Sequence, residues 1–307
     1  MNINEDYKIV IIGAGTAGLT AAIYALRAGQ RVIILDGKGY GGQIGSTDKV
    51  ENYPGFKSIS GFDFATALYE QAKALGAKIK FSNVIAVNKD ENGFIAETEK
   101  VAYKAKSIII ATGLEKRKLG IDREEMLTGK GISYCATCDG AFYKGKRVAV
   151  VGGGNTALED ALFLSEYCEK VYLIHRRNEY RAENAYVQKI NTKENIQQLT
   201  SYVPVEIKGT DSLEEFKVKS LADNTEISLE VDGVFVAIGQ TPSNTIFKDI
   251  VDLDESGYII ADESCKTSTE GIFVAGDCRT KEIRQLVTAA SDGAVAGIAA
   301  AKYVREN

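Results

Sequence analysis

The chain has 307 residues, of which 45% are hydrophobic and 26% charged, and it carries a formal net charge of −5. This length predicts about two globular domains, and the acidic balance argues against nucleic-acid binding, which requires a basic surface. The polar start at 1–8 does not resemble a secretory signal, so we expect a cytoplasmic protein without structural disulfides. The uncharged run 9–26 is long enough for a membrane span, but its glycines fit a nucleotide-binding turn better, so no membrane association is expected.

The first predicted elements form a dinucleotide-binding unit. An apolar strand at 7–12 leads through a glycine-rich turn into a helix at 16–28, and a second apolar strand ends at Asp36. The first glycine makes the tight turn, the second lets the backbone approach a pyrophosphate, and the third lets the helix pack on the strand. These glycines are Gly13, Gly15 and Gly18. A carboxylate at the position of Asp36 accepts hydrogen bonds from the ribose hydroxyls of an unphosphorylated adenosine, so this unit suits FAD or NAD.

The next segments continue with mixed helical and strand patterns. The spacing of apolar residues predicts a helix over 61–77, and Asn92-Gly93 between alternating runs predicts a hairpin. An apolar strand at 107–111 then ends in Thr112-Gly113. Residues 114–130 are polar and charged, which is typical of a connection between domains.

A second unit at 147–175 repeats residues 8–36 without a gap. Its turn and helix start comprise Gly152, Gly154, Asn155, Thr156 and Ala157. Asp36 is replaced by His175, which three arginines follow: Arg176, Arg177 and Arg181. Guanidinium groups bind phosphate through charge-assisted hydrogen bonds, whereas a carboxylate would repel it. The second unit therefore suits NADPH, although an ordinary solvated arginine cluster at a strand end is the alternative.

The rest of the chain completes two domains. A helix is predicted over 183–198, strands near 199–208, 214–220 and 225–238, a turn at 241–244 and a final helix over 285–304. The last part has no fingerprint of its own and most simply completes the first domain. We therefore predict an α/β fold of two Rossmann-like, three-layer domains, each a parallel sheet with antiparallel insertions, with one domain inserted into the other. The predicted boundaries are 1–116 with 245–307 for the domain of the first dinucleotide-binding unit and 117–244 for the domain of the second, which also carries the cysteine pair described next.

A pair of cysteines separated by two residues precedes the second unit. Cys135 and Cys138 can form a redox disulfide or supply half of a zinc site. Zinc would need two more ligands, but His175 is the only histidine and the remaining cysteines are scattered singly, so a redox pair is favoured. Asp139 can move the proton that thiol–disulfide exchange requires, or it can cap a turn or helix. The other cysteines are interpreted as structural; they are Cys168, Cys265 and Cys278.

Several motifs in this order resemble those of bacterial low-molecular-weight thioredoxin reductases. They run from the first glycine turn through the segments 41–56, 108–113, 133–142 and 150–161 to 175–182 and 271–294, nearly the full chain. The resemblance implies FAD in the discontinuous domain, NADPH in the inserted one, a Cys135–Cys138 disulfide as the redox-active centre, and a homodimer. The FAD residues that it implies beyond the first fingerprint are Gly42, Gln43, Asn52, Thr112, Gly113, Gly276, Asp277, Arg284 and Gln285.

The implied activity is electron transfer from NADPH through FAD to Cys135–Cys138 and then to the disulfide of thioredoxin. By family analogy Cys138 faces the flavin and Cys135 attacks the substrate. Two alternative functions remain: an enzyme of the same fold that serves another small redox protein, such as a glutaredoxin-like or peroxiredoxin system, and a nucleotide-sensing or structural module with idle cysteines. A separate alternative concerns only the segment 284–294, which is an ordinary packing helix if it does not contact the flavin.

Overall fold

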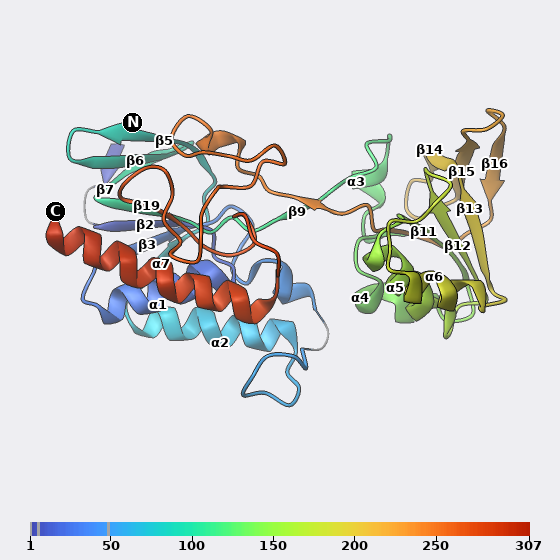
Figure 1. The fold of residues 1–307 in the computed structure, drawn as a ribbon, viewed down its shortest axis with the longest axis horizontal. Coiled ribbons are helices and arrows are strands. Elements are labelled where there is room, and N and C mark those ends of the chain that lie inside the picture. Colours follow the sequence, from blue (N-terminus) through green and yellow to red (C-terminus); the bar gives the residue numbers. More distant parts are fainter. Residues whose placement is uncertain (1, 5–6, 48–49) are drawn as a thin grey trace. The chain divides into compact units, whose positions relative to one another are not determined.

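The computed structural model describes residues 2–4, 7–47 and 50–307, without the side chains of 2–4, 46 and 138. The chain forms two compact units, which are joined by two crossings (Figure 1). Unit 1 comprises Met1–Glu115 and Thr241–Asn307, and unit 2 comprises Lys116–Gln240. Unit 2 is thus inserted into the sequence of unit 1.

The second crossing lies four residues earlier than the boundary expected after residue 244. Asn244 belongs to unit 1 because its side chain is buried there. Its amide donates to the carbonyls of Gly257 (2.9 Å) and Cys278 (2.8 Å), and its Oδ1 accepts a hydrogen bond from Thr112 (3.2 Å). The strands β9 (Glu115–Lys116) and β18 (Gln240–Thr241), which contain the crossings, pair with each other.

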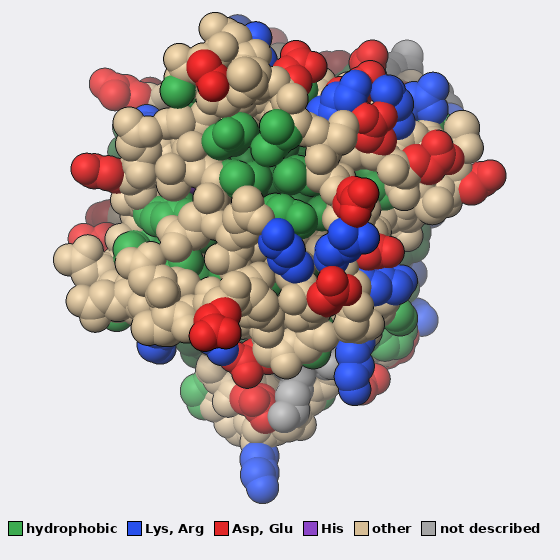
Figure 2. Space-filling view, turned by 90° about the vertical axis from the view of Figure 1, so that its right-hand side faces the viewer, with side chains coloured by type: hydrophobic (Ala, Val, Ile, Leu, Met, Phe, Trp, Pro, Cys, Tyr) green, Lys and Arg blue, Asp and Glu red, His purple; other side chains and the backbone are tan. Residues whose placement is uncertain are grey.

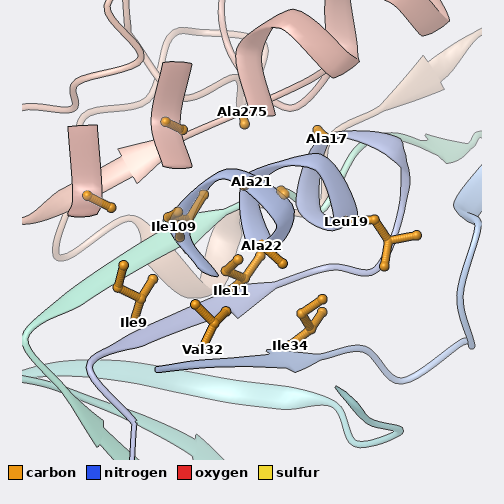
Figure 3. Packing of buried hydrophobic residues seen from close by; sticks show 14 of the residues in the cluster. Ile9, Ile11, Ala17, Leu19, Ala21, Ala22, Val32, Ile34, Ile109 and Ala275 are labelled. Carbon is orange, nitrogen blue, oxygen red and sulfur yellow. The ribbon is translucent and has the colours of Figure 1, made fainter. Parts of the chain in front are cut away.

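Unit 1 has three layers around a parallel five-stranded sheet. The sheet order is β19-β8-β2-β3-β4. Its strands are Ile272–Val274, Ser107–Ile110, Ile9–Ile12, Val32–Leu35 and Lys78–Lys80 in that order. The helices α1 (Thr16–Arg27), α2 (Gly61–Ala74) and α7 (Leu286–Glu306) cover one face, where Ile9, Ile11 and Ile34 pack against Leu19 and Ala21 (Figure 3). A smaller sheet covers the other face, with the order β1-β7-β6-β5, namely Asn2–Asn4, Val101–Ala105, Gly93–Thr98 and Val84–Asp90.

Two glycines let α7 approach α1 closely. A Cβ on Gly293 would lie 2.3 Å from the carbonyl oxygen of Ala17, and one on Gly297 would lie 2.5 Å from that of Ala21. Contacts this short exclude any side chain at these positions. The start of α7 is therefore held beside the start of α1, where the first glycine turn ends.

Unit 2 repeats the three-layer arrangement. Its parallel sheet has the order β10-β17-β11-β12-β13, with the strands Ile132–Ser133, Gly233–Val236, Arg147–Val151, Lys170–His175 and Ile196–Thr200. The helices α4 (Ala136–Asp139), α5 (Asn155–Ser165) and α6 (Asn184–Asn191) lie on one side. The antiparallel sheet β14-β15-β16, formed by Tyr202–Lys208, Glu215–Ser220 and Glu226–Leu229, packs on the other face, and α3 is Glu124–Leu127.

Two predicted elements of unit 2 are wrong in extent. The helix expected over 183–198 ends at Asn191, because Ile196 and Leu199 turn their side chains into the core as part of strand β13. The single strand expected over 225–238 is two strands in different sheets, β16 and β17. Apolar alternation alone does not reveal such a change of sheet. Among the helices that the structure describes, none combines the length and hydropathy that a membrane span requires.

Candidate active site

The first glycine turn connects β2 to α1 and positions Asp36. A Cβ on Gly18 would lie 1.9 Å from the carbonyl oxygen of Gly13, so the helix reaches the turn only with glycine there. The carboxylate of Asp36 points back at the turn, because its two oxygens accept the N–H groups of Ala14 (2.7 Å) and Lys38 (2.7 Å). Each oxygen keeps a second lone pair for an outside donor. This orientation fits a ribose diol above the turn.

The other predicted flavin residues approach the same end of the unit 1 sheet from separate segments. The loop that contains Gly42 pairs with the first turn, since Gly41 N–H donates to the carbonyl of Ala14 (2.8 Å). The side chain of Gln43 donates to the carbonyl of Leu114 (2.9 Å), next to the expected pair Thr112 and Gly113. Asn52 donates to the side chain of Gln285 (3.3 Å), which caps the N-terminus of α7. A positive helix end is thus close to these polar groups.

Asp277 carries a buried acceptor without a partner. Its Oδ1 has no hydrogen-bond partner among the described residues. Burial raises the pKa of Asp277 above its ordinary value, and the cations Lys281 and Arg284 offset this only in part. A buried polar atom of this kind is costly unless a donor meets it. Hydroxyl groups of a bound flavin chain would supply that donor, so the residues present fit FAD.

A buried ion network holds the segment around Asp277 in place. The carboxylate of Asp292 on α7 accepts hydrogen bonds from Arg279 Nε and one terminal nitrogen (both 2.9 Å), from Lys281 Nζ (2.8 Å) and from Gly276 N–H (3.0 Å). Burial alone would raise the pKa of Asp292, but the hydrogen bonds from Arg279 and Lys281 outweigh it and lower the pKa. The sequence interpretation did not identify Asp292 or Arg279. A charged pair inside otherwise small, apolar segments was the available signal.

Arg284 stabilises the same segment from the other side. Its guanidinium donates to the carbonyls of Asp277 (3.3 Å) and Arg279 (3.3 Å) and stacks 4.2 Å from the ring centre of Tyr258. The backbone of Gly276–Arg279 is therefore held by Asp292 and by Arg284. The helix that follows, α7, packs on α1 through Gly293 and Gly297, so the segment 284–294 combines close helix packing with these polar contacts.

The second glycine turn differs from the first in its contact with the residue that ends the second strand of the unit. His175 does not point outward: a Cβ on Gly153 would lie 2.2 Å from its ring. Its Nε2 is 3.1 Å from the carbonyl of Glu179, and its ring stacks on Tyr180 at 5.5 Å. Burial lowers the pKa of His175, and the neighbouring arginines lower it further. His175, expected among the NADPH-binding residues, lies against Gly153 of the turn, because its ring fills the space that the missing side chain of Gly153 leaves.

The three arginines that follow are exposed. Within the described part of the chain, Arg176, Arg177 and Arg181 have no carboxylate partner. The backbone N–H of Arg181 donates to the carbonyl of Gly153 (2.7 Å), which brings this arginine beside the turn. Asn155 ties the helix start to the same loop through two hydrogen bonds with Glu183, and Thr156 is exposed. Uncompensated cations beside a glycine turn fit the 2′-phosphate of NADPH.

The cysteine pair lies at the short helix α4, with Cys135 at its N-cap and Cys138 within it. Cys135 precedes this helix and is disulfide-bonded, whereas Cys168, Cys265 and Cys278 are buried free thiols. The side chain of Cys138 lies outside the described residues, so its pairing with Cys135 stays a prediction. Among the residues that the structure describes, no cluster of three or more metal-binding side chains is present.

Asp139 is connected to Cys135 through a serine. Ser133 Oγ donates to Asp139 Oδ2 (2.6 Å), and the N–H of Cys135 donates to Ser133 Oγ (3.0 Å). Asp139 precedes the 3₁₀ turn Gly140–Tyr143, yet its side chain makes no capping bond there. The structure thus shows no capping bond from Asp139, and proton transfer by this carboxylate stays a prediction.

A half-buried acid, Asp160, and a half-buried lysine, Lys116, interact electrostatically with each other, and Lys116 also interacts with Asp139. Burial and, to a lesser extent, the charge of Glu159 together raise the pKa of Asp160 on α5 to about 7, although Lys116 offsets part of the rise. Burial lowers the pKa of Lys116, which the carboxylates of Asp139 and Asp160 partly offset. Sequence patterns did not identify either residue, because both are polar residues at unremarkable positions of a strand and a helix.

Replacing Asp160 with asparagine should stabilise the protein more at pH 8 than at pH 5. The folded-state pKa of Asp160 lies above its ordinary value of 3.8, so its ionisation destabilises the fold progressively between pH 4 and pH 7. The gain at pH 8 should be about 2 kcal/mol, since each pKa unit corresponds to roughly 1.4 kcal/mol and the site is not fully buried. Urea unfolding at both pH values measures it, with Glu166→Gln at the exposed end of α5 as the control. An equal gain at both pH values would contradict the assignment.

Comparisons with known proteins identify the family of the chain. The model of the pyridine nucleotide-disulphide oxidoreductase family matches residues 7–293. A Clostridium pasteurianum protein described as a 34.2 kDa protein in the rubredoxin operon is 43% identical over 305 residues, which cover 99% of both chains. A thioredoxin reductase of Treponema pallidum is 41% identical over 303 residues, covering 98% of both. A crystal structure of Lactococcus lactis thioredoxin reductase superposes with a TM-score of 0.83 at 37% identity, covering 98% of this chain and 100% of the other.

These similarities extend over nearly the whole chain. The predicted family and the predicted α/β fold class are thereby confirmed. The chain belongs to the pyridine nucleotide-disulphide oxidoreductase family.

Proposed function

We propose that the protein is an NADPH-dependent thioredoxin reductase. The observation that carries this proposal is the disulfide-bonded Cys135 in the same unit as a glycine turn flanked by exposed arginines. Relatives named thioredoxin reductase that align over the full chain support it. When bound, FAD supplies the two-electron chemistry that connects a nicotinamide to a disulfide.

The residues of unit 1 hold the flavin nucleotide. Asp36 would accept the ribose hydroxyls, the backbone of the turn Gly13–Gly18 would bind the pyrophosphate, and Asp277 would accept hydroxyls of the flavin chain. Gln285 and the N-terminus of α7 would stabilise negative charge on the flavin, since a helix N-terminus is positive. In unit 2, Arg176, Arg177 and Arg181 bind the 2′-phosphate. His175 holds the turn beneath them.

Cys135 and Cys138 exchange electrons with the substrate through a mixed disulfide. Two electrons reduce the Cys135–Cys138 bond to two thiols. The Cys135 thiolate then attacks one sulfur of the thioredoxin disulfide, forming the mixed disulfide and releasing a thiolate on thioredoxin. Cys138 attacks Cys135 in turn, which restores the internal disulfide and frees the second thioredoxin thiol. Asp139, positioned by Ser133, takes up and returns the protons of these steps.

A protein substrate requires an exposed surface beside the disulfide. Phe142 lies four residues after Cys138 and is 74% exposed. Hydrophobic side chains also gather near the centre of the face drawn in Figure 2. Exposed apolar side chains such as Phe142 are typical of protein-binding surfaces. We propose thioredoxin or a similar small disulfide protein as the partner, and a cytoplasmic homodimer as the functional form.

Two measurements test the function. Anaerobic NADPH should bleach the flavin absorbance, which a nucleotide-sensing module with idle cysteines would not allow. NADPH should then reduce an aromatic disulfide reagent only when thioredoxin is added, and Cys138→Ser should abolish this turnover while the bleaching persists. Cys168→Ser, at a buried free thiol, is the matched control and should keep full turnover. Turnover with a glutaredoxin-like protein but not with thioredoxin would favour the same-fold alternative.

A further inference from the structure

The segment through which the chain enters unit 2 holds the residue directly before the redox disulfide. We propose that Lys116 and Glu124 are positioning residues that fix Tyr134, and through it the backbone of Cys135, in the geometry that disulfide reduction requires. This inference rests on the proposed function. It assigns a role to three residues that neither nucleotide site nor the cysteine pair uses.

Glu124 is a buried carboxylate that is satisfied by neutral donors. Its side chain accepts the N–H groups of Leu119 (2.7 Å) and Gly120 (2.9 Å) and the hydroxyl of Tyr134 (2.6 Å), and the residue is only 2% exposed. Burying a carboxylate is costly, and its hydrogen bonds only offset that cost. An apolar residue in this place would cost less. The carboxylate therefore has a role beyond stability: its hydrogen bond fixes the position of the Tyr134 hydroxyl group.

Lys116 holds the other end of the same tyrosine. Its Nζ donates to the backbone carbonyl of Tyr134 (3.0 Å) and lies 5.9 Å from the centre of the Tyr134 ring. Lys116 is half-buried, so this contact is weakly screened by solvent. Burial and the hydrogen bond to Glu124 raise the pKa of Tyr134, so its hydroxyl remains a donor over the working pH range. Tyr134 is thus bound at both its carbonyl and its hydroxyl.

Because Tyr134 and Cys135 are adjacent in the chain, fixing Tyr134 also restrains Cys135. Cys135 follows Tyr134 in an extended conformation (φ −146°, ψ 99°) and begins helix α4. Ser133, on the other side of Tyr134, binds the Cys135 N–H and the Asp139 carboxylate. Fixing Tyr134 therefore sets both the direction of Cys135 and the distance between Cys135 and its proton-transfer partner. A one-ångström displacement at a reacting group is enough to slow catalysis by about a hundredfold.

Tyr134→Phe is the decisive variant, because it removes one hydroxyl and leaves Glu124 with two amide donors. We expect thioredoxin-dependent kcat to fall about tenfold, with the KM for NADPH and the rate of flavin bleaching unchanged. The equilibrium of the Cys135–Cys138 pair with a dithiothreitol redox buffer should shift several-fold. Lys116→Met should act in the same direction. Tyr202→Phe, a tyrosine partly buried in the same core of unit 2, is the matched control and should leave every value unchanged.

A stability role alone would give a different pattern. If Tyr134→Phe lowers only the melting temperature and leaves both kcat and the dithiol equilibrium at wild-type values, the positioning role is refuted. Loss of flavin bleaching in the variant would also refute it, because the effect would then not be confined to the disulfide. A wild-type protein that NADPH does not bleach would instead overturn the proposed function itself.

Discussion

Asp292→Asn should weaken FAD binding by about a hundredfold, corresponding to roughly 3 kcal/mol. Asp292 is the only acceptor described for Lys281 and binds Arg279 through two nitrogens, and all three side chains are at most 5% exposed. Neutralising it leaves two buried cations without their shared counter-charge, and removal of one partner from a buried pair is strongly destabilising. The segment Gly276–Arg279 would loosen, and Asp277 would lose its orientation. Titration of the apoprotein with FAD, followed by flavin fluorescence, measures the change.

Glu263→Gln provides the matched control for Asp292. Glu263 also pairs with Arg279 (3.0 Å), but its own side chain is 89% exposed. Exposed pairs of this kind contribute about 0–1 kcal/mol, so FAD affinity should change by less than about fivefold. Equal losses in both variants would indicate that the net charge near the site matters rather than the buried network. Unchanged affinity in Asp292→Asn would remove the network from the flavin site altogether.

A site residue could be predicted from the sequence where the structural requirement on it involves only residues close to it in the chain. The glycine turns were readable because each glycine answers a local backbone requirement, as the 1.9 Å approach at Gly18 illustrates. The Asp292–Arg279 pair joins a strand end to a helix that begins after an intervening loop, and no spacing rule connects two such charges. The same holds for Glu124 and Tyr134, which meet only once α3 has folded against the redox loop.

The role of His175 shows a second kind of limit. The alignment placed it correctly at the end of the second strand, but the residue type alone favoured contact with phosphate. Only the packing reveals that its ring lies beneath Gly153, which aligns with Ala14 of the first turn. In the first unit the N–H of Ala14 meets Asp36, whereas in the second an imidazole fills the equivalent space. Gly153, in place of the alanine of the first turn, was the feature of the sequence that indicated this packing.

Replacing Arg176 and Arg177 together by alanine should raise the KM for NADPH by about a hundredfold and leave the KM for NADH unchanged. Each charge-assisted hydrogen bond to a phosphate contributes roughly 1.5–3 kcal/mol, of which solvent screening at an exposed site removes part. NADH has no 2′-phosphate, so it loses nothing when the guanidinium groups are removed. Steady-state flavin reduction with each nucleotide gives both values, and the KM for NADPH should rise with ionic strength more steeply in the wild type than in the double variant, which keeps Arg181.

Lys189→Ala tests whether the KM for NADPH depends on these particular arginines or only on the total positive charge of unit 2. Lys189 is an exposed cation on α6 and lies outside the loop that carries the arginines. Because interactions between exposed charges weaken within about 10 Å at 0.1 M salt, its removal should change the KM for NADPH by less than about twofold. A similar loss in Lys189→Ala would point to a general field rather than a phosphate site. If the Arg176 and Arg177 double variant raises the KM for NADH as much as that for NADPH, the arginines support the turn itself, and discrimination between the two nucleotides must come from elsewhere in unit 2.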